Sequence, residues 1–509
     1  MHLFHATATV LAALCTATPA LADLTVEQAW ATWKAQVAAY GLTLDARESR
    51  DGKALQIGQM RLTFAFPMEM GSAYASFAGP RFEPLGDGRV AVTFPETGHL
   101  ALGGEVRDEG SLAVVLETSV TGAQGLMSGT PGEVVSDWKY DSMTFRLLDV
   151  AVSGSEVPEL SGLFRSGPAT LQNVTRIDDS HVTIDGRSAF TSYDFSYEVA
   201  VPGSGDVAAM ITASGLAEEM ATDSVIKLPR GGIDLLGLHA QLRDGMHLET
   251  WVTAARTRSD QSTREGDALL MTQTAEMQDY DVTMKLGPAG LDYRGRTGQF
   301  SVGGETPDLP VPFTLSGSGV DFHLLVPLLM GEDQDVALRM GLYDLAMADG
   351  LWALFDPEGQ LSRDPATLVI DLGATVSLLF EFLDVRAMIG GARPPELPVM
   401  AKTARLNDLR IAAAGAELTG EGDITLDYTD WETFDGMPAP DGRASFQLTG
   451  AHALLDKLIA MGLVSEEDAM GARLVLGMVS KPDGDTDSLR SEIEVRKTGE
   501  VVANGVRLK

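Results

Sequence analysis

The residues with the most suggestive chemical spacing form an acidic segment near the carboxyl end of the chain. Four carboxylates fall at positions 1, 3, 5 and 12 of a twelve-residue loop of the calcium-binding kind: Asp483, Asp485, Asp487 and Glu494. Ser488, however, stands at position 6, where such a loop needs glycine, and Arg490 adds a positive charge inside the loop. We therefore predict an acidic turn between a helix and a strand, and no metal site.

The histidines lack the spacing of metal ligands on a helix. Six of them follow residue 22: His99, His181, His239, His247, His323 and His452. His239 and His247 flank a turn signal at Asp244-Gly245, so the two could meet across a hairpin. The zinc-protease pattern H-E-x-x-H does not occur. The sequence therefore favours surface or core histidines.

Motifs for nucleophilic catalysis or nucleotide binding are also missing. The Gly-Ser-Gly runs at 203–205 and 317–319 lack the G-x-S-x-G spacing of a nucleophile elbow. Neither a P-loop nor a dinucleotide-binding glycine motif is present. The sequence thus predicts no catalytic residues, no cofactor and no enzyme activity.

The first 22 residues have the layout of a secretory signal peptide. An apolar run at 6–14 is followed by Pro19 and by small residues ending at Ala22, just before Asp23. We expect cleavage after Ala22 and a periplasmic location. The single cysteine, Cys15, lies in this segment, so the mature chain is expected to contain no thiol and no disulfide.

Charge and hydropathy narrow the class of protein further. The net charge of −34 repels nucleic acid, which is therefore excluded as a partner. Past residue 22, no run reaches the roughly 18 consecutive apolar residues of a membrane-spanning helix. We expect no transmembrane segment in the mature chain.

The elements that would have to position any site are mainly strands. Apolar and polar residues alternate in segment after segment, most clearly at 193–201, and each segment ends in a turn signal. The 54 glycines, against 23 prolines, fit many tight turns. A loose motif of alternating residues with an aspartate near its end recurs at 145–150, 340–345 and 406–411. We predict a mainly β (α+β) protein built on a long curved antiparallel sheet or trough with a few short helices.

Four helices are expected among these strands. Thr25 and Gln28 form a capping box for the first, which ends at Gly41. A second, short and apolar, is expected at 322–329, and a third at 451–461. Ser465 caps a fourth that runs to about Met478. The short run at 315–319 offers the best boundary, so we divide the chain into a signal peptide (1–22), an N-terminal β-rich region that opens with a helix (23–318) and a C-terminal β-rich region with short helices (319–509).

Apolar residues gather in the second half of the chain. The segments 324–330 and 376–383, together with the 21 methionines, predict a broad and deformable hydrophobic surface. That surface could be the core beneath the sheet, or it could be a groove for an acyl chain or another extended apolar ligand. The pattern leaves both interpretations open.

Several segments along the chain carry a family resemblance. They are 26–30, 351–357, 363–368, 416–422, 434–440, 448–456, 469–473 and 503–505. These segments resemble the DUF2125 family, exported bacterial proteins of unknown function, and the resemblance implies no catalytic residues. More distantly, the strand at 418–422 and the hydrophobic helix expected after it are similar to AsmA-like envelope proteins. That similarity implies a long sheet curved into an apolar trough and a role in lipid movement or outer-membrane assembly.

Together these features favour an exported, non-catalytic envelope protein that binds lipid or another apolar ligand, or that assists outer-membrane assembly. The alternative is an acidic scaffold or interaction module with an envelope protein as its partner. A hydrolase is the third hypothesis.

Overall fold

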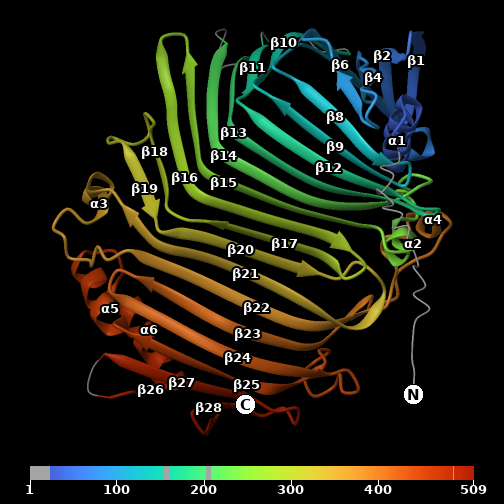
Figure 1. Ribbon diagram of the computed structural model, residues 1–509. Coiled ribbons are helices and arrows are strands. Elements are labelled where there is room, and N and C mark those ends of the chain that lie inside the picture. The colour runs from blue at the N-terminus through green and yellow to red at the C-terminus, as the bar shows by residue number, and fades with distance from the viewer. Residues whose placement is uncertain (1–22, 154–159, 202–207, 485–486, 509) are drawn as a thin grey trace, which may run out of the picture.

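The computed structural model describes residues 23–153, 160–201, 208–484 and 487–508, and it is dominated by one large antiparallel β-sheet (Figure 1). The predicted signal peptide at 1–22 and the turn after residue 201 lie outside the described residues. The predicted mainly β fold, with a long antiparallel sheet and a few short helices, is confirmed. Among the described helices, none is both long enough and apolar enough to cross a membrane.

The helices are short and sit at the ends of strands. They are α1 (Val26–Ala39), α2 (Leu238–Arg243), α3 (Asp349–Phe355), α4 (Val385–Ile389), α5 (Ala451–Ala460) and α6 (Glu466–Val479), with one 3-10 turn, η1 (Pro67–Glu69). The capping box of Thr25 and Gln28 forms as predicted, and Ser465 caps α6 by accepting a hydrogen bond from the Asp468 backbone.

The strands follow one another through the sheet. The first part contains β1 (Thr43–Asp51), β2 (Ala54–Ala65), β3 (Gly71–Ala78), β4 (Arg81–Pro84), β5 (Val90–Thr93), β6 (Thr97–Val106), β7 (Gly110–Thr121), β8 (Gln124–Thr130), β9 (Glu133–Tyr140), β10 (Ser142–Val152), β11 (Leu160–Ser166) and β12 (Ala169–Ile177). The middle contains β13 (His181–Val201), β14 (Ala209–Pro229), β15 (His247–Glu265), β16 (Ala268–Gly287), β17 (Gly290–Thr297), β18 (Phe300–Glu305), β19 (Phe313–Gly317), β20 (Gly319–Val326) and β21 (Gly331–Met347). The last part contains β22 (Ala366–Leu378), β23 (Val399–Ala413), β24 (Ala416–Asp427), β25 (Ala439–Thr449), β26 (Lys481–Pro482), β27 (Ser488–Val495), β28 (Val501–Ala503) and β29 (Val506–Arg507).

From β13 to β16 and from β20 to β25 each strand pairs with its neighbours along the chain, whereas earlier strands also pair across short separations, as in β3–β6, β5–β8, β7–β10 and β9–β12. The long ladders β13–β14, β14–β15 and β15–β16 are all antiparallel (Figure 1). The sheet also continues across the predicted boundary at residue 318, because β20 pairs with β17 before that point and with β21 after it. The division into two regions therefore coincides with no break in the sheet and stays a prediction.

A single line of irregularities, which we call the bend line, crosses the sheet and divides it into two arms. On this line β11 and β12 both pair with β13, β17 and β18 both pair with β16, and β19 and β20 both pair with β21. The long strands β13–β16 change direction there (Figure 1). The upper arm contains β3, β6, β7, β10, β11, β18 and β19, and the lower arm contains β4, β5, β8, β9, β12, β17, β20 and the strands from β22 onward.

Left-handed backbone occurs on the bend line in three of the strands that cross it. Glu219 in β14, Asp279 in β16 and Asp344 in β21 have φ of 50°, 50° and 52°. This explains the predicted motif ending in aspartate: 340–345 contains Asp344, and register shifts also interrupt the ladders at Leu147/Asp149 and Leu406/Leu409. Because a bulge inserts one extra residue and bends a strand, the motif encodes curvature of the sheet.

Glu219 offers a test of this account, since a non-glycine residue pays a steric cost in the left-handed region. Glu219→Gly is expected to leave stability unchanged or raise it by up to about 1 kcal/mol, whereas Glu219→Val is expected to lower it by about 1–2 kcal/mol. Chemical denaturation of the three proteins followed by circular dichroism measures the order. A valine variant as stable as the glycine variant would contradict it.

One predicted element is wrong. The segment 322–329 was expected to form a short apolar helix, but residues up to Val326 belong to strand β20. Phe322, Leu324 and Val326 lie on one face and His323 on the other, and the strand pairs with both β17 and β21. A short apolar run cannot distinguish a buried helix from a strand, and here pairing on both sides decided the outcome.

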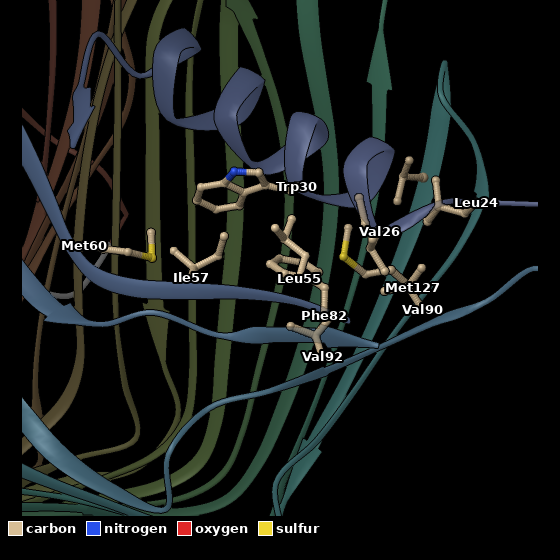
Figure 2. Packing of buried hydrophobic residues seen from close by; sticks show 12 residues of the cluster. Leu24, Val26, Trp30, Leu55, Ile57, Met60, Phe82, Val90, Val92 and Met127 are labelled. Atoms are coloured by element: carbon tan, nitrogen blue, oxygen red, sulfur yellow. The ribbon is translucent and has the colours of Figure 1, made fainter. Parts of the chain in front are cut away.

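The best-packed core lies beneath α1, at the amino-terminal end of the sheet (Figure 2). Trp30 is 2 % exposed and packs against Phe82, with ring centroids 5.8 Å apart. Its indole nitrogen donates a hydrogen bond of 2.6 Å to Glu48 in β1. A second cluster joins Ala39 to Val182, Leu228 and Met246, so α1 is fixed to both β2 and β13.

Candidate functional site: an apolar concave face

Alternation along the strands of the lower arm places two uncharged rows of residues on one side of the sheet, which we call the inner face. Side chains at every second position of a strand share a face, and directly paired residues share it too. The first row runs through Gly295, Phe322, Met340, Ile370, Leu409, Gly420, Phe446 and Ser491. The second row runs through Tyr293, Leu324, Leu338, Leu372, Leu406, Gly422, Ala444 and Ile493.

The opposite face of the same strands, the outer face, is polar and held by ion pairs. Arg339 lies 2.9 Å from both Asp321 and Asp371, and it also donates to the Tyr343 hydroxyl. The hydrogen bond to Asp371 is the main cause that raises the pKa of Arg339 above its usual value. The sheet is therefore strongly two-sided, with its charges on one face only in this region.

Large apolar side chains on the inner face remain open to solvent. Met340 is 50 % exposed, Ile411 41 % and Leu372 40 %. A sheet face that served only as a core would bury these side chains, and apolar patches of this extent mark binding sites. The sequence left two interpretations open, a core beneath the sheet or a groove for an apolar ligand. The exposure of these side chains agrees with a groove on the inner face of the lower arm.

Aromatic residues on this side lie flat over glycines in the neighbouring strand. A Cβ atom added to these glycines would come within 2.3–2.4 Å of the aromatic ring in each pair: Gly125 and Trp138, Gly215 and Phe195, Gly317 and Phe300, Gly420 and Phe446. Glycine in a strand interior often marks close approach of another group. Here it lets the rings lie along the sheet, which leaves room above them.

A pocket of about 420 Å³ opens on the inner face at the bend line. Its lining comes from both arms, with Trp138 and Leu171 from the lower arm and Leu100, Met143 and Phe145 from the upper arm. Because both arms contribute to one hollow, the inner face is the concave side of the bend. The lining is mostly hydrophobic and aromatic, as in pockets for apolar ligands.

Trp33 of helix α1 packs against two aromatic residues of the pocket wall. The Trp33 ring lies 5.9 Å from Phe94 and 6.2 Å from Trp138, and those two rings are 5.9 Å apart. Both Phe94 and Trp138 line the pocket. The same aromatic cluster therefore joins the core under α1 to the open part of the concave face.

In the acidic segment 483–494, the described carboxylates form hydrogen bonds and ion pairs within the protein. Asp487 accepts a hydrogen bond of 2.9 Å from the Ala453 backbone at the start of α5, and Glu494 pairs with Arg496 at 3.0 Å. Asp485 lies outside the described residues. Where the structure is described, no three His, Cys, Asp or Glu side chains form a possible metal site. The predicted turn joins β26 to β27, so it follows a short strand and not the helix directly.

The two histidines that could have met across a hairpin lie instead in different kinds of element. His239 belongs to α2 and approaches Asp384 at 3.8 Å, while His247 begins β15 and contacts the Gly245 carbonyl at 3.1 Å. The turn at Asp244-Gly245 thus ends a helix and does not close a hairpin. It was misread because a helix of six residues leaves little periodic signal.

Asp178 stabilises the turn between β12 and β13 and makes stability depend on pH. Its carboxylate accepts hydrogen bonds from the Ser180 and His181 backbones, both at 2.7 Å, which lower its pKa to about 2. The folded pKa lies below the usual 3.8, so this stabilisation is complete above about pH 4 and is lost as the pH falls towards 2. Asp178→Ala is expected to lower the unfolding midpoint at pH 7 but to have little effect at pH 2. An equal loss at both pH values would contradict this assignment.

The apolar segments noted in the sequence are divided between core and surface. In 376–383, Val376 and Leu378 are buried, whereas Leu379 and Phe382 are about 40 % exposed. Leu324 lies on the inner face, as described above.

No known protein family matches the chain, and no curated protein matches it either. The resemblance to the DUF2125 and AsmA-like proteins therefore stays a prediction from the motifs.

Proposed function

We propose that this protein is an exported, non-catalytic periplasmic protein that binds an extended apolar ligand, such as a lipid acyl chain, along its inner face. The observation that supports the proposal is the uncharged double row from β17 to β27. Seven inter-strand spacings of about 4.8 Å make each row about 34 Å long. This length suits an extended chain better than a compact ligand.

The pocket at the bend line supports the same proposal. It adds a partly enclosed hollow to the open rows, and its walls are mostly hydrophobic and aromatic side chains. Most of this lining offers no hydrogen-bond partner, so a polar or charged substrate would lose more hydration than the few polar side chains there replace, which costs free energy. An apolar chain would instead gain from burial, at about 25 cal/mol for each Å² removed from water.

The proposal can be tested on protein purified from the envelope fraction. We expect mass spectrometry of organic extracts to detect co-purified lipid, and we expect delipidated protein to take up a fluorescent fatty acid. Trp33 and Trp138 lie at the pocket, so a brominated fatty acid should quench their emission. Trp138→Phe should remove part of the quenching while retaining uptake.

Lipid-free protein that takes up no fatty acid would overturn the proposal. Crosslinking in cells addresses the alternative of an acidic scaffold. One abundant protein partner without bound lipid would favour the scaffold, whose contacts would then involve the charged outer face.

A further inference from the structure

The inner face of the upper arm can be followed strand by strand from the pocket. Phe145 lines the pocket and pairs with Phe164, which in turn pairs with Phe195 in β13. The row then continues through Gly215 in β14 to Ser259 in β15. Because directly paired residues share a face, Ser259 lies on the same side of the sheet as the pocket.

Neutral polar side chains gather on this face in β15 and β16. Thr257, Ser259 and Gln261 occupy alternate positions of β15, so all three share the inner face. Gln261 pairs directly with Gln273 in β16, and both glutamines are half-buried. None of these four side chains has a hydrogen-bond partner among the described residues. Their donors and acceptors are therefore free to bind a ligand.

The hydroxyls on the outer face of the same two strands are bonded within the protein. The Ser262 hydroxyl lies 2.7 Å from the Thr212 hydroxyl. Thr274, next to Gln273 in the chain, donates a hydrogen bond of 2.7 Å to Asp260. The free polar groups thus belong to the inner face and are not a general property of these strands.

Two aromatic rings lie beside the free polar groups. Phe195 and Tyr197 have ring planes 11° apart and centroids separated by 6.3 Å, and their side chains are 37 % and 38 % exposed. Only Ala213 and Gly215 of β14 stand between these rings and β15. These small residues leave open a space two inter-strand spacings wide, about 10 Å.

We propose that these residues form a binding site for a neutral hydroxylated ring, as in a sugar. We call this site the neutral patch, and it comprises Phe195, Tyr197, Thr257, Ser259, Gln261 and Gln273. One face of a pyranose carries C–H groups that pack on an aromatic ring, and its edge carries hydroxyls that need donors and acceptors. A glutamine amide supplies both, and so does a serine or threonine hydroxyl. A few polar groups beside apolar walls are typical of sites that fix the orientation of a small ligand.

Charge excludes a phosphate or carboxylate as the ligand of the neutral patch. The three rows that pass through Tyr193, Phe195 and Tyr197 contain no charged side chain from β11 to β19. Proteins usually recognise such anions through Arg or Lys, and an anion covered without a cationic partner costs free energy.

The neutral patch and the lower arm can hold two parts of one molecule. Strands β15 and β16 cross the bend line, so they carry the inner face from one arm to the other (Figure 1). A lipid with a sugar headgroup would place its chain on the apolar rows and its sugar on the neutral patch. This assignment to a headgroup rests on the proposed function, whereas the sugar site itself does not.

Isothermal titration calorimetry of the delipidated full chain tests the proposal. The probes are dodecyl maltoside, dodecyl phosphate and free maltose, with each detergent kept below its critical micelle concentration. We expect dodecyl maltoside to bind at least tenfold more tightly than dodecyl phosphate, because the two share one alkyl chain and differ in the headgroup. The double variant Gln261→Leu with Gln273→Leu should lose at least tenfold in maltoside affinity. Its uptake of a fluorescent fatty acid should stay unchanged.

Matched variants separate a binding role from a structural one. Ser259→Ala should weaken maltoside binding, whereas Ser262→Ala, on the outer face of the same strand, should not. Tyr197→Ala should weaken it and Tyr197→Phe should not, since the phenylalanine keeps the ring. Circular dichroism should show that all variants are folded.

The outcomes also distinguish the source of the sugar. Binding of the maltoside without binding of maltose would assign the neutral patch to a lipid headgroup. Binding of free maltose that the double variant loses would assign it to a free sugar. A chain that binds maltose but takes up no fatty acid would overturn the proposed function and leave the sugar site standing. Equal affinity for the two detergents, or unchanged maltoside binding by the double variant, would overturn the sugar site.

Discussion

Replacing Trp30 with alanine is expected to lower the free energy of unfolding by about 3–5 kcal/mol, the usual cost of removing a buried tryptophan. Trp30 is 2 % exposed and lies between α1 and the first strands, against Phe82 and Trp33. The substitution leaves a cavity where α1 is fixed to the sheet. Denaturant unfolding followed by circular dichroism measures the loss.

Trp30→Phe serves as the matched control, because it keeps an aromatic ring but removes the hydrogen bond to Glu48. That bond is the main cause that lowers the pKa of Glu48 below its usual 4.5. Its stabilising effect is therefore present above about pH 4.5 and decreases as the pH falls. The phenylalanine variant should lose less stability than the alanine variant, and its deficit should shrink at low pH. Equal stabilities of all three proteins would contradict the packing described here.

Introducing one charge on the inner face, Met340→Glu, is expected to reduce fatty-acid binding at least tenfold. Met340 sits in the middle of the first uncharged row, between Phe322 and Ile370. A bound chain would cover the new carboxylate and remove it from water without a partner, at a large cost in free energy. In the free protein the side chain is 50 % exposed, so the fold should tolerate the change. Titration with a fluorescent fatty acid measures the affinity.

Gln447→Glu is the control for Met340→Glu. It adds the same charge to the outer face, at an exposed position paired with Arg490, and should leave binding unchanged. Equal effects of the two substitutions would mean that net charge, and not the inner face, governs binding. No effect of either would place the ligand elsewhere on the protein.

Local signals in the sequence predicted the helices with clear caps and most of the strands. The capping box at Thr25 and the N-cap at Ser465 depend only on nearby residues, and α1, α5 and α6 begin and end close to the predicted positions. The strand β20 was missed because it is defined by its pairing with β17 and β21 on its two sides. Nothing within the segment 322–329 itself shows that pairing. Short apolar runs carry no local evidence of such pairing.

The sequence predicted the chemical character of the candidate site but not its position or shape. Alternating apolar residues indicated a hydrophobic surface, but alternation does not say whether another layer covers it. The pocket draws Phe77, Phe94, Phe145 and Leu171 from four separate segments, and they meet because the bend line folds the two arms towards each other. Of the three aspartate-containing motifs, only the one at 340–345 lies on the bend line, where Asp344 has a positive φ.

The meander topology has a consequence for how the chain folds. Each strand pairs mainly with strands adjacent in sequence, so most of the sheet assembles from contacts that are local along the chain, and loop closure costs little entropy. Like a stack of structural repeats, such an array can nucleate at one hairpin and extend strand by strand. The two ends differ greatly in packing, with a dense aromatic core under α1 and only small buried residues, Ala451 and Ala469, under α5 and α6. Fraying should therefore begin at the carboxyl end, and the amino-terminal strands should retain hydrogen-exchange protection longest.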